Sequence, residues 1–299
     1  MNKRFSRIAL VGKVEDARVA DSMVALARHL RSRGLVVLVD RDITVADLPG
    51  DAERRPMEML AGDADLIVAI GGDGTMLFAA QLVIGRNIPL LGINRGRLGF
   101  LTDVSPDDML ESFDSVLQGR YEADARSLLE VRLTGTGGPD AVRRALNDVV
   151  VQRHESGRMV ELETWIGGQF VNRHGGDGLV IASSTGSTAY ALSCGGPIIH
   201  PSLDALVIAP ISPHTLSDRP IVIGRNSRVE VRLVERSGTH AQVTCDGMLL
   251  GNLDASSNLV IEPAAGSVTL LHPPGYDSFR LLRSKLHWGR SARSGRLEP

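Results

Sequence analysis

Short apolar runs alternate with helix-like segments over the first 120 residues of the chain. The runs at residues 8–11, 35–39, 66–70 and 89–93 have the length and aliphatic composition of buried parallel strands. Between the first two, residues 20–30 carry apolar side chains at helical spacing. Because strands and helices alternate, we predict a doubly wound α/β domain with a parallel sheet at residues 1–120.

A helix start stands near the end of this region. The run Ser105-Pro106-Asp107-Asp108 combines a capping serine, a proline at the first helical position and acidic residues in the first turn. We predict a helix from this point to about Gln118, with Gly119 as its stop signal.

The pattern changes beyond residue 120. Short alternating runs, such as residues 129–133, 228–233 and 241–244, are separated by many glycines, which predicts an all-β domain at residues 121–275. Residues 276–286 are helix-like again, with Phe279, Leu282 and Leu286 on one face. We expect the C-terminal segment, residues 276–299, to pack this helix back on the N-terminal domain.

Composition narrows the class of protein. Hydrophobic residues make up 43% and charged residues 23% of the chain, and the formal net charge is -2. Such a chain is typical of soluble globular proteins, and neither nucleic acid nor membrane is an expected partner. Cys194 and Cys245 stand far apart and form no CxxC spacing. We therefore predict no disulfide framework and a cytoplasmic location.

Lysine is scarce, which constrains how phosphate could be bound. It occurs only at Lys3, Lys13 and Lys285, and none of these follows a Gly-x-x-x-x-Gly run. A Walker-type loop needs its lysine on the β- and γ-phosphates and is therefore excluded. Backbone N–H groups, arginine or a metal must bind any phosphate.

The turn Gly71-Gly72-Asp73-Gly74-Thr75 directly follows an apolar run and precedes a helix-like segment. Ligands of open α/β sheets bind beyond the carboxyl ends of the strands. Three glycines let backbone N–H groups approach an anion, and the helix N-terminus adds positive potential. Asp73 suits a proton acceptor for an attacking hydroxyl, or a Mg²⁺ ligand. A tight turn with a capping aspartate is the alternative for this turn taken alone.

Two further stretches carry polar groups next to apolar runs. Residues 183–190, Ser-Ser-Thr-Gly-Ser-Thr-Ala-Tyr, follow the apolar residues 179–182. Hydroxyls can donate to phosphate or ribose there and Tyr190 can stack on a flat ring, whereas the alternative is a Ser/Thr-rich surface loop. Asn147-Asp148 precedes Val149-Val150-Val151 and suits a ribose diol. Taken alone, this pair is interpreted as a strand-end turn.

Together the three stretches resemble the three signatures of the NAD kinase family, in the family's order and spacing. Gly92-x-Asn94, the run at residues 96–101, Pro213-His214-Thr215-Leu216, Asp246-Gly247 and the proteobacterial-type ending at residues 283–289 are also similar. The resemblance covers essentially the whole chain. The glycine turn alone is shared with diacylglycerol and sphingosine kinases, whereas the run at residues 185–190 is far more specific.

The resemblance implies transfer of the γ-phosphate of ATP to the adenosine 2′-hydroxyl of NAD, giving NADP. Asp73 would be the catalytic base, and a divalent metal, Mg²⁺, is implied without assigned ligands. A homo-oligomer, a dimer or a tetramer, is implied as well. The substrate contacts that the resemblance assigns are Asp73, Gly74, Phe100, Asn147, Asp148, Arg158, Gly175, Asp177, Thr185, Thr188, Ala189, Tyr190, Ala191, Leu192, Ser193, Asp246 and Met248.

The chain departs from the family pattern at several of these positions. Gly175-Gly176 stands where the family usually has Arg-Ala, which removes a guanidinium. Ser184, Cys194 and Met248 also replace the common residues, and Asp148 stands where glutamate is frequent. These departures bear on substrate affinity and phosphate-donor preference rather than on the class of reaction. A lipid kinase that shares the Asp73 turn and a non-catalytic dinucleotide sensor remain the alternatives.

Overall fold

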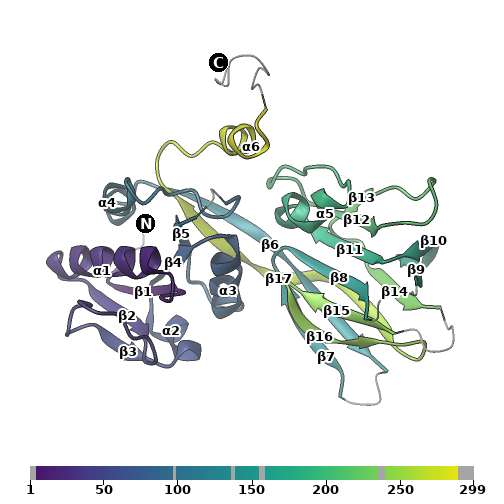
Figure 1. Ribbon diagram of the computed structural model, residues 1–299, viewed down its shortest axis with the longest axis horizontal. Coiled ribbons are helices and arrows are strands. Elements are labelled where there is room, and N and C mark those ends of the chain that lie inside the picture. The colour runs from purple at the N-terminus through teal and green to yellow at the C-terminus, as the bar shows by residue number, and fades with distance from the viewer. Residues whose placement is uncertain (1–4, 97–98, 136–138, 155–158, 235–239, 289–299) are drawn as a thin grey trace. The chain divides into compact units, whose positions relative to one another are not determined.

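The computed structural model describes residues 5–96, 99–135, 139–154, 159–234 and 240–288 of the chain. It divides into two compact units, shown in Figure 1. The first unit is Met1–Ala125 together with Val268–Pro299, and the second unit is Arg126–Ser267. The long strands β6 (Glu122–Thr134) and β17 (Asn258–His272) each contribute residues to both units.

The first unit is built on a parallel sheet, as the alternating pattern predicts. Its strands lie in the order β5-β4-β1-β2-β3, and the end of β17 adds to β5 through the parallel pair Leu270 and Leu90. Every residue of the two central strands β4 and β5 is buried. The strands are β1 (Arg7–Gly12), β2 (Val36–Asp40), β3 (Glu53–Arg55), β4 (Leu66–Gly71) and β5 (Leu90–Asn94).

Helices flank this sheet. Helix α1 (Ala17–Ser32) is N-capped by Asp16 and buries Met23, Leu26 and Leu30 in a cluster that also contains Phe113 of α4 (Met109–Leu117). The helices α2 (Met57–Asp63) and α3 (Asp73–Val83) contact each other. Helix α4 begins one turn later than predicted. The Ser105 hydroxyl accepts the backbone N–H of Asp108 and donates to its carboxylate, which forms a separate turn before the helix.

The C-terminal helix α6 (Ser278–Leu286) belongs to the first unit. Asp277 caps it by accepting the backbone N–H groups of Phe279 and Arg280. Leu281 and Leu282 are its buried side chains, whereas Phe279 is 56% exposed. The prediction that Phe279 lies on the packed face was wrong, because the helix turns a pair of adjacent leucines inward.

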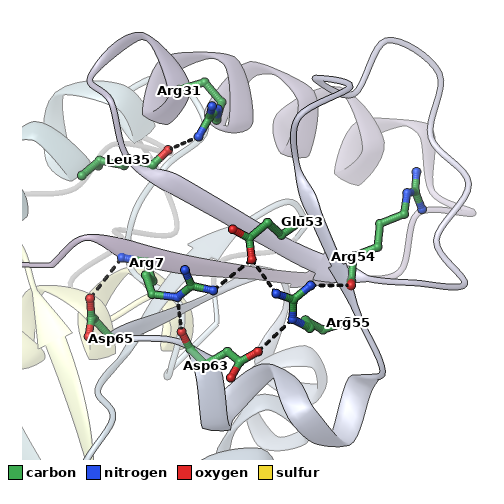
Figure 2. A network of polar contacts seen from close by, with 8 residues as sticks. All are labelled: Arg7, Arg31, Leu35, Glu53, Arg54, Arg55, Asp63 and Asp65. Carbon is green, nitrogen blue, oxygen red and sulfur yellow. Dashed lines mark hydrogen bonds and ion pairs between the residues drawn. The ribbon is translucent and has the colours of Figure 1, made fainter.

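An ion-pair network holds the polar edge strand β3, which no hydrophobic pattern indicates (Figure 2). One carboxylate oxygen of Glu53 accepts from both Arg7, at 3.0 Å, and Arg55, at 2.7 Å. Arg55 also pairs with Asp63 of α2 at 2.8 Å. Arg7 donates to the backbone carbonyl of Asp63 at 2.7 Å. These bonds fix the strand to β1 and α2, so charge rather than apolar burial ends the sheet here.

The second unit is β-rich, as predicted, and its core lies between two groups of strands. A six-stranded antiparallel sheet has the order β13-β12-β11-β8-β15-β16, and β10-β9-β14-β17 with β6 and β7 form the other group. Side chains from both groups share one apolar cluster. The strands are β7 (Ala141–Ala145), β8 (Asp148–Arg153), β9 (Val160–Ile166), β10 (Gln169–Gly176), β11 (Gly178–Ser183), β12 (Ala205–Ile211), β13 (Ile221–Gly224), β14 (Val229–Leu233), β15 (Ala241–Cys245) and β16 (Met248–Leu253).

Two short helices cover the other face of the six-stranded sheet. They are η1 (Thr185–Thr188) and α5 (Tyr190–Ser193), and they follow directly from β11. Along β8 the side chains alternate, so Val149 and Val151 enter the main core while Val150 faces a second cluster with Ala191 and Ile199. This second cluster anchors the segment that carries the predicted hydroxyl-rich run.

Candidate active site

The glycine turn joins β4 to α3 in the first unit. A methyl group at Gly71 would lie 2.2 Å from the Thr75 hydroxyl oxygen, so only glycine allows this close approach. Gly72 is extended and precedes helix α3, and Asp73 is the first residue of that helix. Gly74 is exposed, and a methyl group there would meet no described atom within 4 Å. The turn therefore presents free backbone at a helix N-terminus, which suits an anionic ligand.

The half-buried carboxylate of Asp73 is held by the loop that follows β5. Its two oxygens accept the backbone N–H groups of Phe100, at 2.8 Å, and Leu101, at 2.9 Å. A methyl group at Gly99 would lie 1.9 Å from the nearer carboxylate oxygen, so the loop packs directly against Asp73. Each carboxylate oxygen has two lone-pair sites, so one remains on each for a proton or a metal ion. Asp73 is more than a helix cap, because it bridges two loops.

In the second unit, Asp246 organises the predicted Asn147-Asp148 pair. Asp246 and Gly247 both have positive φ, 49° and 77°, and form the two-residue turn of the β15–β16 hairpin. The Asp246 carboxylate accepts the backbone N–H groups of Leu146, Asn147 and Asp148 at 2.7, 2.8 and 3.1 Å. The resemblance assigns Asp246 to the substrate, but in the structure its carboxylate supports the residues beside it.

The hydroxyl-rich run packs against the same pair. The Ser183 hydroxyl donates to the carbonyl of Leu146 at 2.6 Å, and the Ser183 N–H donates to the carbonyl of Asn147 at 2.9 Å. A methyl group at Gly186 would lie 2.2 Å from that same Asn147 oxygen. Thr185 is buried, at 6% exposure, which contradicts the surface-loop alternative. The structure thus brings the Asn147-Asp148 pair and the run at residues 183–190 together.

Along the rest of the run, the side chains differ in their access to a ligand. Tyr190 and Ser193 are exposed, and Thr188, Ala189 and Leu192 are partly exposed. Ala191 is fully buried in the cluster beneath the helix, so its side chain is not available for the contact that the resemblance assigns to it.

Burial and neighbouring charges raise the pKa values of several side chains around the Asn147-Asp148 pair. Burial, and then the charge of Asp246, raises the pKa of Asp148 from 3.8 to about 7. Burial, followed by the charge of Asp148, raises the pKa of the Cys194 thiol. Burial raises the pKa of Tyr190 as well, with added contributions from Cys194 and Asp177. These mutual effects place five polar side chains in one electrostatic neighbourhood, as is common at functional sites.

Asp177 lies between β10 and β11 and is paired with Arg153 at 2.9 Å. Both side chains are 32% exposed. The two glycines before Asp177 differ: a methyl group at Gly176 would lie 2.8 Å from two backbone carbonyl oxygens, whereas Gly175 has open space. A larger side chain therefore fits at residue 175 but not at residue 176 without a backbone shift.

The remaining predicted site residues are placed as follows. Met248 begins β16 beside the Asp246 turn and is 37% exposed. Phe100 is half-buried beside Asp73. Arg158 lies outside the described residues.

Sequence reasoning missed Arg126, which is only 3% exposed and donates to the Thr185 hydroxyl at 3.4 Å. Arg126 shares strand β6 with the buried Leu128 two residues on. Residues two apart face the same side of a strand, so a charged residue on an apolar face was the available signal. Its contact makes it a neighbour of the hydroxyl-rich run.

Within the described ranges, no three His, Cys, Asp or Glu side chains form a group that could hold a metal ion. None of the helices in the described part of the chain is both long and apolar enough to cross a membrane.

Both units of the chain match families of known proteins. The ATP-NAD kinase N-terminal domain family matches residues 8–121, and the ATP-NAD kinase C-terminal domain family matches residues 146–272. An NAD kinase from Methylococcus capsulatus is 42% identical over 288 residues, which cover 96% of this chain and 99% of that protein. One from Nitrosospira multiformis is 43% identical over 289 residues, covering 96% and 97%.

Two solved structures share the fold. The crystal structure of an NAD kinase from Archaeoglobus fulgidus in complex with ATP is 28% identical, with a TM-score of 0.71, and the match covers 94% of this chain and 98% of that one. Yeast NADH kinase complexed with NADH has a TM-score of 0.88 at 23% identity, covering 98% and 90%, and supports the fold alone.

An α/β unit with the Asp73 turn, followed by a β-rich unit, thus has the domain pair of the ATP-dependent kinases that act on NAD. The chain belongs to the NAD kinase family. This membership sets aside the lipid-kinase alternative.

Proposed function

We propose that the protein transfers the γ-phosphate of ATP to the 2′-hydroxyl of the adenosine ribose of NAD, giving NADP and ADP. Family membership supplies the two substrates. The observation that carries the residue-level proposal is Asp73, a carboxylate at a glycine turn whose orientation two backbone N–H groups fix. A fixed carboxylate with a lone pair remaining on each oxygen suits a proton acceptor.

Asp73 would act while the ribose hydroxyl attacks. That hydroxyl is a poor nucleophile at neutral pH, and removing its proton during the attack is typically worth about 10²–10⁴-fold in rate. The rest of the rate enhancement in phosphoryl transfer comes from positioning and from stabilising charge on the phosphate oxygens. The backbone N–H groups of Gly72 and Gly74, at the start of α3, suit that second task, since the chain has no Walker lysine.

The second unit supplies the groups proposed to hold NAD. The protonated form of Asp148 can donate a hydrogen bond to a ribose oxygen, and the Asn147 amide can donate or accept. Within the described residues, the buried carbonyl oxygen of the Asn147 side chain has no hydrogen-bond partner. Tyr190 and Ser193 are exposed on the segment that follows β11 and suit stacking and hydroxyl contacts. Asp177 suits the nicotinamide half of the substrate.

A divalent metal, Mg²⁺, is proposed to reach the reaction with the phosphates of ATP. Mg²⁺ usually binds one or two carboxylates together with substrate phosphates, rather than an all-protein cage. Asp73 fits such a role as well, because its two backbone hydrogen bonds leave lone pairs free. When bound, the metal supplies charge neutralisation on the transferring phosphate.

The proposal extends to location and assembly. A cytoplasmic location is supported by two free cysteines, one of them buried. A homo-oligomer, a dimer or a tetramer, is supported by the family resemblance and by the frequency of such closed symmetries. Light scattering would test this part, and a mass near the 32.1 kDa of one chain would contradict it.

The activity is tested by incubating the purified protein with NAD, ATP and Mg²⁺ and then detecting NADP with a strictly NADP-dependent dehydrogenase. NADP that appears in proportion to the protein supports the proposal. Binding of NAD without any NADP, under several phosphate donors, would instead support the non-catalytic dinucleotide sensor.

A further inference from the structure

Two side chains from the C-terminal part of the first unit contact the loop at residues 99–103, here named the Asp73 loop because its N–H groups hold Asp73. One is His272, the last residue of β17, whose Nδ1 lies 2.8 Å from a carboxylate oxygen of Asp103. The other is Lys285 of α6, whose Nζ lies 5.0 Å from the centre of the Phe100 ring. The loop is therefore contacted at both of its ends by residues far along the chain.

His272 is a rigid anchor. Its side chain is 2% exposed, and its ring stacks on Tyr276 with 3.7 Å between centroids and an interplanar angle of 10°. Its second ring nitrogen lies 3.6 Å from a carboxylate oxygen of Asp124. A ring that is stacked on one face and hydrogen-bonded at Nδ1 has little freedom, so it fixes Asp103. Asp103 in turn precedes Val104, which bridges to Ile93 of β5.

Lys285 contacts the other end of the loop through a cation–π interaction. The lysine ammonium is attracted by the face of an aromatic ring at this separation. The rotation of α6 that brings Lys285 to Phe100 is set by its two buried leucines, Leu281 and Leu282. Phe100 is the residue whose N–H donates to Asp73 at 2.8 Å. Lys285 thus contacts the side chain of a residue whose backbone N–H group holds the Asp73 carboxylate.

The middle of the Asp73 loop packs against β5, where Leu101 and Thr102 are 4% and 0% exposed and a methyl group at Gly92 would lie 2.9 Å from the Leu101 carbonyl oxygen. Gly99 has no side chain, and the buried hydroxyl of Thr102 makes no hydrogen bond in the part of the chain that the structure describes. The loop amides can hold Asp73 only while the loop keeps its conformation. The contact at Phe100 is made to the side chain of one donating residue, and the contact at Asp103 lies two residues beyond the other donor, Leu101.

We propose that His272 and Lys285 are positioning residues for Asp73, which they orient through the Asp73 loop without touching substrate. The inference rests on the proposed function in one respect, that Asp73 accepts the proton of the attacking hydroxyl. His272 and Lys285, which follow the β-rich unit in sequence, on this account act on the reaction only indirectly, through the loop. Loss of either contact frees the loop, so the Asp73 carboxylate is less often in its reactive orientation, whereas substrate binding persists.

The test compares Lys285→Met with Lys285→Arg, which retains the cation, and with Arg280→Met, which removes a positive charge from the exposed side of the same helix. Asp103→Ala is compared with Asp103→Asn, which can still accept the hydrogen bond from His272. Changing Asp103 is preferred to changing His272, because replacement of a buried ring endangers folding. Each protein is measured for hydrogen exchange of the Phe100 and Leu101 amides, for thermal unfolding, and for kcat and KM with NAD and ATP.

We expect Lys285→Met and Asp103→Ala to speed exchange of the two amides by about two- to thirtyfold, the range set by a contact of this strength. The value of kcat should fall by a similar factor with both KM values unchanged. Lys285→Arg, Asp103→Asn and Arg280→Met should behave as the wild type.

Unchanged exchange and kcat in Lys285→Met and Asp103→Ala would overturn the proposal. An equal loss in Arg280→Met, or a general loss of thermal stability in place of the local change, would overturn it too. Wild-type protein that makes no NADP would refute the proposed function instead, and the exchange measurement would still decide whether these residues hold the loop.

Discussion

The carboxylate of Asp246 accepts a hydrogen bond of 2.8 Å from the backbone N–H of Asn147, a residue 99 positions earlier in the chain. The same carboxylate also binds the N–H groups of Leu146 and Asp148. One side chain at the tip of a hairpin therefore satisfies three donors and sets the conformation of the pair proposed to hold NAD. The negative charge of Asp246 also helps to keep Asp148 protonated near neutral pH.

Asp246→Asn should weaken both the fold and NAD binding, although Asp246 is not proposed to touch the substrate. Asparagine tolerates the positive φ of this turn, but its NH₂ group would face backbone donors. Leaving such donors unsatisfied costs about 1–3 kcal/mol of stability. We expect that loss in a denaturant titration and a roughly tenfold weaker NAD affinity by calorimetry. Unchanged NAD affinity in a destabilised protein would show that the support is structural only.

The raised pKa of Asp148 predicts a pH-dependent stability. The folded-state pKa, about 7, lies above the value of 3.8 for an unperturbed carboxyl group. The contribution of Asp148 to stability is therefore fully present below about pH 3.8 and has been lost once the pH has risen through 7, because over that range the unfolded state releases the proton that the folded state keeps. Asp148→Asn lacks this titration. We expect the variant to gain on the order of 2 kcal/mol relative to wild type between about pH 5 and pH 8.

Chemical denaturation of both proteins at the two pH values measures this difference. Other carboxyl groups titrate in the two proteins alike and cancel in the comparison. A stability difference that does not change with pH would contradict the raised pKa.

Gly74 provides a test of the glycine turn that does not depend on Asp73. A methyl group at Gly74 meets no atom in the described structure, so Gly74→Ala should fold normally. Replacing a helical glycine with alanine typically stabilises by up to about 1 kcal/mol. If substrate phosphate or ribose approaches this backbone, the methyl group obstructs it and kcat/KM falls by at least roughly tenfold.

Gly62→Ala is the matched control for Gly74→Ala. Gly62 is also exposed in a helix, α2, and a methyl group there would make only an ordinary 3.5 Å contact with Arg86. We expect equal or higher melting temperature and unchanged kinetics for this control. Full activity in Gly74→Ala would exclude close approach of a substrate to the turn.

The elements that the sequence predicted well were those with a strong hydrophobic period. The central strands β4 and β5 are buried on both faces, and this appears in the sequence as a continuous apolar run. Strand β3 was not predictable in this way, because it joins the sheet through ion pairs of Glu53 with Arg7, 46 residues earlier, and of Arg55 with Asp63 in the following helix. The packed face of α6 was mispredicted because two adjacent leucines, rather than a regular stripe, are buried.

Contacts between residues far apart in sequence also limited what could be predicted about the site. Motifs identified Asp73, Asn147 and Asp148 because their residue types are unusual beside apolar runs. The roles of Gly99 and Asp246 depend on contacts across 26 or more residues of sequence, such as the Phe100–Asp73 hydrogen bond with its separation of 27. Only a folded structure shows that Asp246 supports backbone, or that His272 and Lys285 reach the loop around Asp73.

The measurement that tests the central claim most directly is NADP formation by wild type and by Asp73→Asn, together with their NAD affinities. Asparagine keeps one acceptor oxygen, so one of the two hydrogen bonds to the Asp73 loop survives, but it cannot accept the ribose proton. We predict NADP formation by wild type, kcat lower by about 10²–10⁴-fold in the variant, and NAD affinity within about threefold of wild type. Equal kcat values for the two proteins would contradict the role of Asp73, and absence of NADP from wild type would contradict the proposed function itself.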